Sequence, residues 1–99
     1  MADERQIATN QGNGNSTAIE ISRYGNLLES HLRTLFVSGT FDSATVKYQI
    51  SLDNSIFFDV VDADNITANK VINVEHRARY HRINVASGLG SESINAWVV

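Results

Sequence analysis

Cysteine and proline are both absent from the 99-residue sequence. Without a thiol, the chain can form no disulfide, no thiolate metal site and no cysteine nucleophile. No hydrophobic run approaches the ~20 residues that a membrane-spanning helix requires, and the polar segment 1–16 is unlike a signal peptide. We therefore expect no association with a membrane.

Positive charge is scarce as well, because eight Lys and Arg side chains stand against eleven Asp and Glu, for a net charge of −3. A protein that binds nucleic acid needs basic residues interleaved with aromatics on one exposed face. Residues 77–82 have this composition, but on a strand they would place only Arg77, Arg79 and His81 on one face. We therefore predict no nucleic-acid partner.

The remaining composition is enough for one packed core, since 42% of the residues are hydrophobic and 19% are charged. Residues 1–16 are the exception. They are rich in Asn, Gln, Gly and Ser, and Ile7 is their one bulky apolar side chain after Met1. So little apolar surface cannot offset the entropy lost on ordering. We predict a flexible N-terminal arm over 1–16 and a single domain over 17–99.

The domain is dominated by the period-2 alternation that is typical of strands with one buried face. Apolar residues alternate with polar ones over 44–52, and the turn residues at 53–55 lead to a returning strand at 56–62. Further strands are predicted at 18–23, 32–37, 70–74, 77–86 and 93–99. The pattern predicts an all-β fold, an antiparallel β-sandwich or jelly roll of about seven to eight short strands.

Residues 26–35 depart from this pattern. Asn26 and Glu29 have the spacing of a helical capping box, and Leu27, Leu28 and Leu32 fall on one helical face. Because a strand-like sequence follows from residue 34, we predict a turn or a single helical turn at 26–31.

The alternation also predicts which side chains form the core. Apolar residues at the inward positions of the expected strands should meet there, including the one tryptophan. The predicted core contains Val46, Tyr48, Ile50, Val60, Val71, Ile83 and Trp97.

The three histidines are the natural candidates for acid–base chemistry. His76 and His81 are five residues apart, so on one strand they would point to opposite faces, and His31 lies elsewhere in the sequence. No nucleophile, phosphate-binding or dinucleotide motif accompanies them. We predict that the protein is not an enzyme and holds no cofactor.

A cluster of oxygen ligands occurs at Asp59, Asp62, Asp64 and Asn65. Ca²⁺ prefers such ligands, but the spacing lacks the glycine and the distal glutamate of an EF-hand loop. We predict no bound metal.

Charge is distributed unevenly along the chain. Residues 53–65 contain four acids and no base, whereas residues 70–82 contain four bases and one acid. Such opposite patches favour association with another copy or with a patterned partner surface, or they form a salt bridge between neighbouring strands. The predicted partner-binding residues lie in the arm and in these charged loops: Ile7, Asn10, Asn13, Asp62, Asp64, Asn65, Arg77, Arg79 and Arg82.

A succession of short motifs covers about two thirds of the chain. The motifs are Val37-Ser38-Gly39-Thr40-Phe41, Ala44-Thr45-Val46, Ser51-Leu52-Asp53, Phe58-Asp59-Val60, Thr67-Ala68-Asn69, Val71-Ile72-Asn73-Val74, Ala78-Arg79-Tyr80 and Ser93-Ile94-Asn95-Ala96-Trp97. In this order they resemble a family of small structural proteins of tailed-bacteriophage virions. Asn54-Ser55 stands where that family usually has Gly-Gly, and Phe57-Phe58 replaces a frequent Trp, but neither change disturbs a hairpin.

The resemblance implies a non-catalytic virion component that is assembled in the bacterial cytoplasm, a reducing compartment that suits a cysteine-free chain. We expect a capsid decoration (cement) protein on the outer shell, a homotrimer that contacts the major capsid protein and itself. One alternative is a tail fibre, spike or adaptor module that contacts host glycans through exposed aromatics such as Trp97, Tyr24 and Phe57. Another is a carbohydrate-binding or enzyme-accessory sandwich outside the virion.

Overall fold

The computed structural model describes residues 5–20, 33–74 and 78–98. These residues form nine strands and no helix, so none of them belongs to a helix that could cross a membrane. The predicted turn at 26–31 lies outside the described residues. The strands are β1 (Arg5–Gln11), β2 (Gly14–Asn15), β3 (Ile19–Glu20), β4 (Arg33–Thr40), β5 (Thr45–Ser51), β6 (Phe58–Asp59), β7 (Lys70–Val74), β8 (Tyr80–Ala86) and β9 (Ser93–Val98).

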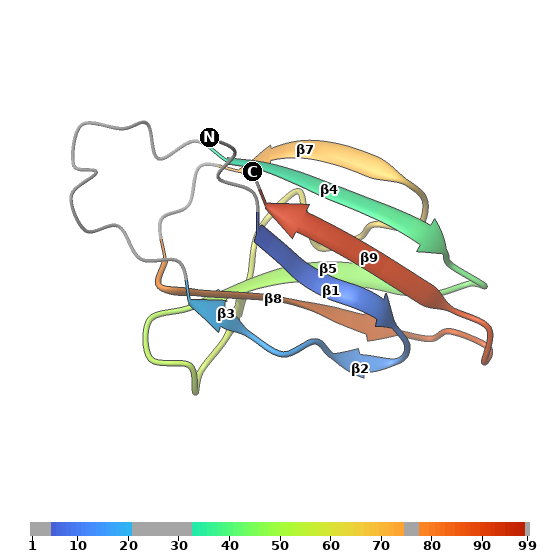
Figure 1. Cartoon of the computed structure of the whole chain (residues 1–99), viewed down its shortest axis with the longest axis horizontal. Helices are drawn as coiled ribbons and strands as arrows, with labels where there is room; N and C mark the ends of the chain where they lie inside the picture. Colours follow the sequence, from blue (N-terminus) through green and yellow to red (C-terminus); the bar gives the residue numbers. More distant parts are fainter. Residues whose placement is uncertain (1–4, 21–32, 75–77, 99) are drawn as a thin grey trace.

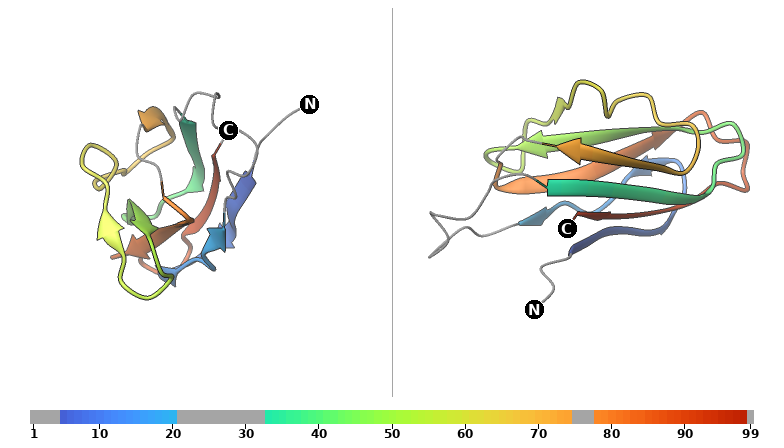
Figure 2. Two further views of the ribbon diagram at one scale, coloured as in Figure 1. Left: turned by 90° about the vertical axis from the view of Figure 1, so that its left-hand side faces the viewer. Right: turned by 90° about the horizontal axis from the view of Figure 1, so that it is seen from above.

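The strands form two antiparallel sheets that stack face to face (Figures 1 and 2). Sheet A has the order β1-β9-β4-β7, and sheet B has the order β2-β8-β5-β6, with β3 also paired to β8. The prediction of an all-β, sandwich-like fold is confirmed at this level, whereas a jelly-roll connectivity is not.

The core lies between the two sheets and consists of side chains from both. Four predicted core residues are at most 3% exposed: Val46, Tyr48, Val60 and Ile83. Ile50 is partly buried and packs against them. Alternation along the strands accounts for this, because in β5, β8 and β9 every second residue over most of the strand is buried.

Two predicted core residues, Val71 and Trp97, are instead directed to the outer face of sheet A. Val71 is 61% exposed. Trp97 is partly exposed and lies between Ala96 and Val98, which are both fully buried. Because successive side chains of a strand point to opposite faces, the burial of these two neighbours directs Trp97 outward. The prediction placed Trp97 on the wrong face of its strand.

The predicted N-terminal arm is not observed over its described residues, because β1 pairs with β9 in sheet A and β2 pairs with β8 in sheet B. Ile7 and Ala8 are both buried, and the register shifts between Gln6 and Ala8, as at a β-bulge. A second shift follows at Asn10, whose φ of 50° lies in the left-handed region that asparagine tolerates. Burial of two adjacent apolar residues is how this polar segment joins the core.

The predicted alternation over 44–52 ends early. Ser51 is buried, and its hydroxyl accepts hydrogen bonds from the backbone N–H groups of Asp53 (3.2 Å) and Asn54 (2.9 Å). This local turn releases Leu52 from the core, so that it is exposed rather than buried as expected. The predicted hairpin is present, although β6 is limited to two residues.

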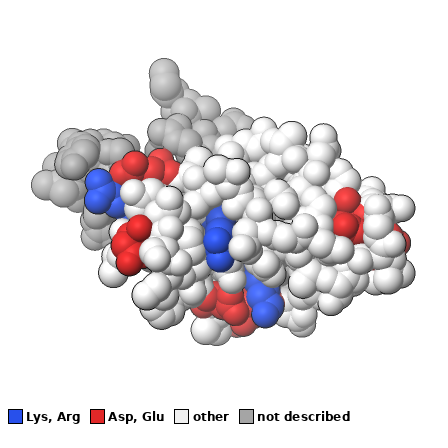
Figure 3. Space-filling view, turned by 90° about the horizontal axis from the view of Figure 1, so that it is seen from below, with Lys and Arg blue, Asp and Glu red and all other residues white. Residues whose placement is uncertain are grey.

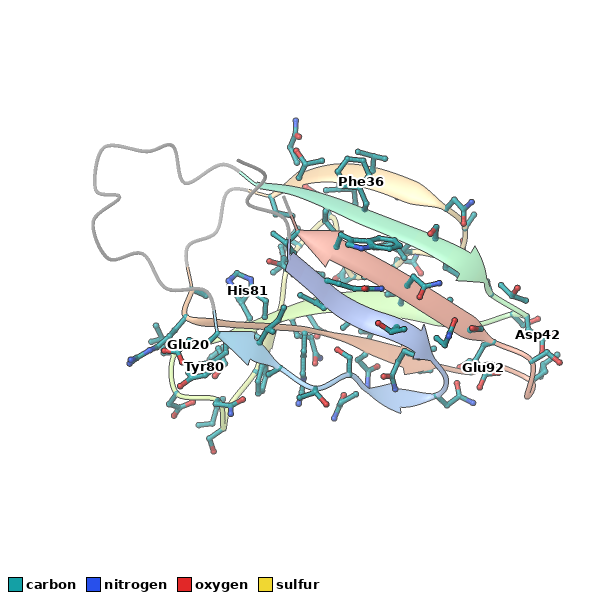
Figure 4. All side chains as sticks on the ribbon, in the orientation of Figure 1. Glu20, Phe36, Asp42, Tyr80, His81 and Glu92 are labelled. Atoms are coloured by element: carbon teal, nitrogen blue, oxygen red, sulfur yellow. The ribbon has the colours of Figure 1, made fainter. Side chains whose placement is uncertain are left out.

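Strand β8 directs His81 into the core, on the same face as the predicted core residue Ile83, and Tyr80 away from it (Figure 4). The His81 ring is hydrogen-bonded through Nδ1 to the Tyr48 hydroxyl and through Nε2 to the Ala78 carbonyl at 2.9 Å. A carbonyl oxygen only accepts, so Nε2 carries a proton and donates it there. These bonds let two polar side chains lie between the sheets.

Candidate interaction surfaces

The outer face of sheet A carries a row of side chains that crosses its four strands. Trp97 of β9 is central, paired with Gln6 of β1 on one side and Phe36 of β4 on the other. Val71 of β7 pairs with Phe36 and ends the row. Phe36 is 40% exposed, and it lies on the side of β4 away from sheet B (Figure 4). The row therefore leaves a continuous apolar strip outside the core.

An open groove of about 540 Å³ runs along this strip. Polar groups of Ser38, Asn69 and Lys70 complete its lining around the aromatic rings. We call it the Trp97 groove, and it is lined by Phe36, Val37, Ser38, Asn69, Lys70, Val71 and Trp97.

Gly39 and Asn69 hold the strands that form the groove in place. The Asn69 side-chain oxygen accepts a hydrogen bond from the Gly39 N–H at 3.1 Å, which ties the loop before β7 to β4. Gly39 has a φ of 134°, and a Cβ there would collide with the Ser93 carbonyl of β9. Only glycine permits this close approach without strain. The loop beside the groove is thus held by the hydrogen bond from the Gly39 N–H to Asn69 as well as by apolar packing.

The strands of sheet A contain three basic residues, Arg5, Arg33 and Lys70, and no acidic residue. Lys70 is exposed at the groove, and no other described residue forms an ion pair with it. The groove therefore combines apolar surface with an available positive charge.

The outer face of sheet B is different, because its polar side chains bind one another. Gln49 donates a hydrogen bond from Nε2 to Asp59 (2.7 Å) and accepts one at Oε1 from Arg82 (2.8 Å). Lys47 lies 3.8 Å from the Asp59 carboxylate, and the Arg82 guanidinium lies 3.7 Å from the centre of the Phe57 ring. On the underside of the molecule, basic and acidic side chains lie beside one another (Figure 3).

Residues 52–64, which we call the acidic segment, contain a second set of exposed apolar side chains. The segment carries four carboxylates and no base. Its four large exposed apolar residues are between 62% and 78% exposed: Leu52, Ile56, Phe58 and Val61. This part of the chain therefore presents apolar and negatively charged side chains together.

The acidic segment is held against β5 by its backbone. The Val60 N–H donates to the Tyr48 carbonyl at 2.9 Å, and the Tyr48 N–H donates to the Ala63 carbonyl at 2.8 Å. The Asp53 carboxylate accepts hydrogen bonds from the N–H groups of Ile56 and Ser55, which hold its pKa below the usual value of 3.8. Backbone hydrogen bonds thus fix the course of the segment along β5 and around Asp53.

Two of the predicted arm residues bind other parts of the domain. The Asn10 backbone N–H donates a hydrogen bond to the Asn95 side-chain oxygen at 3.0 Å. The Asn13 side chain donates to the Gly88 carbonyl at 3.1 Å and accepts from the Gly88 N–H at 2.9 Å. These asparagines replace strand hydrogen bonds with side-chain ones, which composition alone does not reveal.

Glu92 joins the same loops at the end of the sandwich where Asp42 also lies (Figure 4). Its carboxylate accepts hydrogen bonds from the N–H groups of Gly90 (2.7 Å) and Asn13 (3.1 Å). Together with its own N–H, the largest contribution, these donors hold the pKa of Glu92 below the usual value of 4.5.

The structure distributes the predicted partner-binding residues over several places. Ile7 is buried, and Arg79 donates to Glu20 at 2.7 Å. Arg77 lies outside the described residues. Asp62, Asp64 and Asn65 remain together in the loop that follows β6, but among the described residues no group of three or more His, Cys, Asp or Glu could hold a metal.

The sequence-based prediction missed the Trp97 groove. Leu35, Phe36 and Val37 are all apolar, so the sequence does not indicate which of them faces outward. In the structure Leu35 and Val37 are buried, which directs the phenyl ring of Phe36 outward. No protein-family model matches the chain, and searches of curated proteins and of solved structures find no match.

Proposed function

We propose that this protein is a structural, non-catalytic component of a tailed-bacteriophage virion. In this proposal it is a capsid decoration (cement) protein that binds the outer shell as a homotrimer and contacts the major capsid protein and other copies of itself. It would be assembled onto the particle in the cytoplasm of the bacterial host. The motif succession from Val37 to Trp97 supports the family.

One structural observation carries the proposal. The large exposed apolar side chains of the described residues gather on two surfaces, the Trp97 groove and the acidic segment, with Leu89 as the exception. An apolar patch with a polar rim is typical of a protein-contact surface. A shell repeats each weak contact many times, so avidity can hold such a small protein without a deep pocket.

Binding to shells tests this function. The purified protein is mixed with expanded capsids from which the decoration layer has been stripped, and the particles are examined by electron microscopy and thermal disruption. We expect added density on the outer surface and a higher disruption temperature. If saturating protein adds neither density nor thermal stability, the cement function is wrong.

Two matched variants locate the contact. Phe36→Ser changes the outer face of sheet A and should weaken binding to shells. Lys47→Ser changes the outer face of sheet B and should leave that binding unchanged. Circular dichroism establishes that both variants keep the fold before their binding is compared.

A second candidate function is a tail fibre, spike or adaptor module that contacts host glycans. The position of Trp97 favours it, because a partly exposed indole beside Phe36 offers a stacking surface for a sugar ring. Hydroxyl and amide groups of Ser38 and Asn69 line the same groove. Titration with surface polysaccharide from the host should then change the Trp97 fluorescence, and a tagged antibody should label tails rather than shells.

A further inference from the structure

We infer that copies of this chain associate head to tail, with the acidic segment of one copy seated in the Trp97 groove of the next. This inference deepens the proposed function, because it names the two surfaces through which the protein contacts itself. The expectation of a trimer rests on the proposed function, whereas the head-to-tail contact itself does not.

Charge complementarity is the first argument. Lys70 lines the groove, and the strands of sheet A contain no acidic residue. The acidic segment contains no base, and within the described part of the chain neither Asp62 nor Asp64 forms an ion pair. Arg79 and Glu20, by contrast, form an ion pair with each other. The charges left available on the two surfaces are therefore of opposite sign.

Apolar complementarity is the second argument. Phe58 and Val61 project from the acidic segment and are 62% and 73% exposed. The groove is lined by Phe36 and Val71, which are 40% and 61% exposed, and by the partly exposed Trp97. Bringing these surfaces together would remove apolar area from water on both copies.

The positions of the two surfaces determine the kind of contact. The groove opens on the outer face of sheet A. The acidic segment includes β6, which lies at an edge of sheet B (Figure 2). Because these surfaces lie on different sides of the domain, a copy that receives one neighbour in its groove still offers its own segment to another. Such a heterologous contact closes into a ring or continues as a chain.

The outer face of sheet B is a poorer surface for this contact. Lys47, Asp59 and Arg82 already bind partners there, through an ion pair and through hydrogen bonds to Gln49. A second copy would have to desolvate these groups without providing better partners.

Sedimentation equilibrium of the purified full chain tests the inference by charge reversal. Lys70→Glu places a negative charge in the groove, and Asp62→Lys with Asp64→Lys places positive charges on the segment. Each change should weaken self-association roughly tenfold or more, because like charges then face each other. Combining all three substitutions in one chain restores opposite charges and should return the association constant to near that of the wild type.

Asp42→Lys is the matched control for the segment variant, because it makes the same charge reversal at the end of the sandwich, outside the groove lining and the acidic segment, and should leave association unchanged. A wild-type protein that stays monomeric, single reversals without effect, or a combined variant that fails to recover would each overturn the inference. Shell binding is measured separately. A monomer that binds shells contradicts this inference alone, whereas an oligomer that does not bind shells contradicts the cement function alone.

Discussion

The outer faces of the two sheets differ in whether their side chains bind partners within the domain. On sheet B, Gln49 links Asp59 to Arg82, so the polar groups bind one another. On sheet A, Trp97 and Phe36 leave apolar surface in contact with water. Both sheets show the same alternation of buried and exposed side chains, and both bury their inner face. The difference shows that a sandwich of this size can fold with the polar side chains of one outer face bound to one another and with apolar side chains of the other left in water.

The largest expected effect compares the inner and outer sides of one strand. Leu35 and Phe36 are adjacent in β4, but Leu35 is fully buried. We expect Leu35→Ala to lower the free energy of unfolding by about 2–4 kcal/mol, because it leaves a cavity between the sheets. Phe36→Ala should cost about 1 kcal/mol. Urea denaturation measures both, and similar losses would mean that the faces are not distinct.

Trp97 provides the next test. Because its indole lies on the outer face of sheet A, Trp97→Ala should cost about 1–2 kcal/mol, less than the ~3–5 kcal/mol typical of a fully buried tryptophan. Val98→Ala is the control. Val98 is smaller than Trp97 but fully buried, so its truncation should lower the free energy of unfolding by a similar amount. A loss above about 3 kcal/mol for Trp97→Ala would assign that residue to the core.

A smaller effect is expected on the face of sheet B. Gln49→Ala removes the two hydrogen bonds that connect Asp59 and Arg82. Water can replace the lost partners at this surface, so the free energy of unfolding should fall by only about 0.5–1 kcal/mol. Thermal denaturation provides the measurement, with Thr45→Ala on the same strand as the control. If Gln49→Ala costs no more than the control, the network does not stabilise the face.

The smallest effect concerns pH. Backbone donors hold the pKa of Glu92 below 4.5 in the folded protein, so its stabilising contribution is complete above that value. The contribution is lost as the pH falls through the lower folded pKa. Melting temperatures measured from about pH 6 to 3 should therefore fall less steeply for Glu92→Gln than for the wild type. Parallel curves would contradict this role, and Asp53 is expected to add a decline in the same direction.

Much of sheet B could be predicted because its sequence is locally consistent. The alternation around Val46 and Tyr48, followed by turn residues at Asp53 and Asn54, leads to a hairpin under local rules alone. The strand at 70–74 was also predicted with the observed bounds, but the prediction that Val71 faces the core was wrong. A short strand at a sheet edge gives no local signal for which of its faces meets the core.

The strands missed by sequence analysis depend on contacts far along the chain. Residues 5–16 have the composition of a flexible segment, and their order comes from partners such as Asn95 and Gly88. No local pattern encodes a side-chain hydrogen bond across such a separation. The Trp97 groove has the same limitation, because its rings come from β4 and β9 and become neighbours only once those strands pair.

Strand β9 lies between β1 and β4 in sheet A, although it follows both of them in the sequence. Asn10 and Asn95, which bind each other across β1 and β9, are 85 residues apart in sequence. During translation, β1 must therefore wait for nearly the whole chain before its partner leaves the ribosome. Contacts this distant in sequence slow folding. A nascent chain that lacks β9 would leave β1 without its partner strand and β4 paired on one side only, a condition in which exposed strand edges favour aggregation.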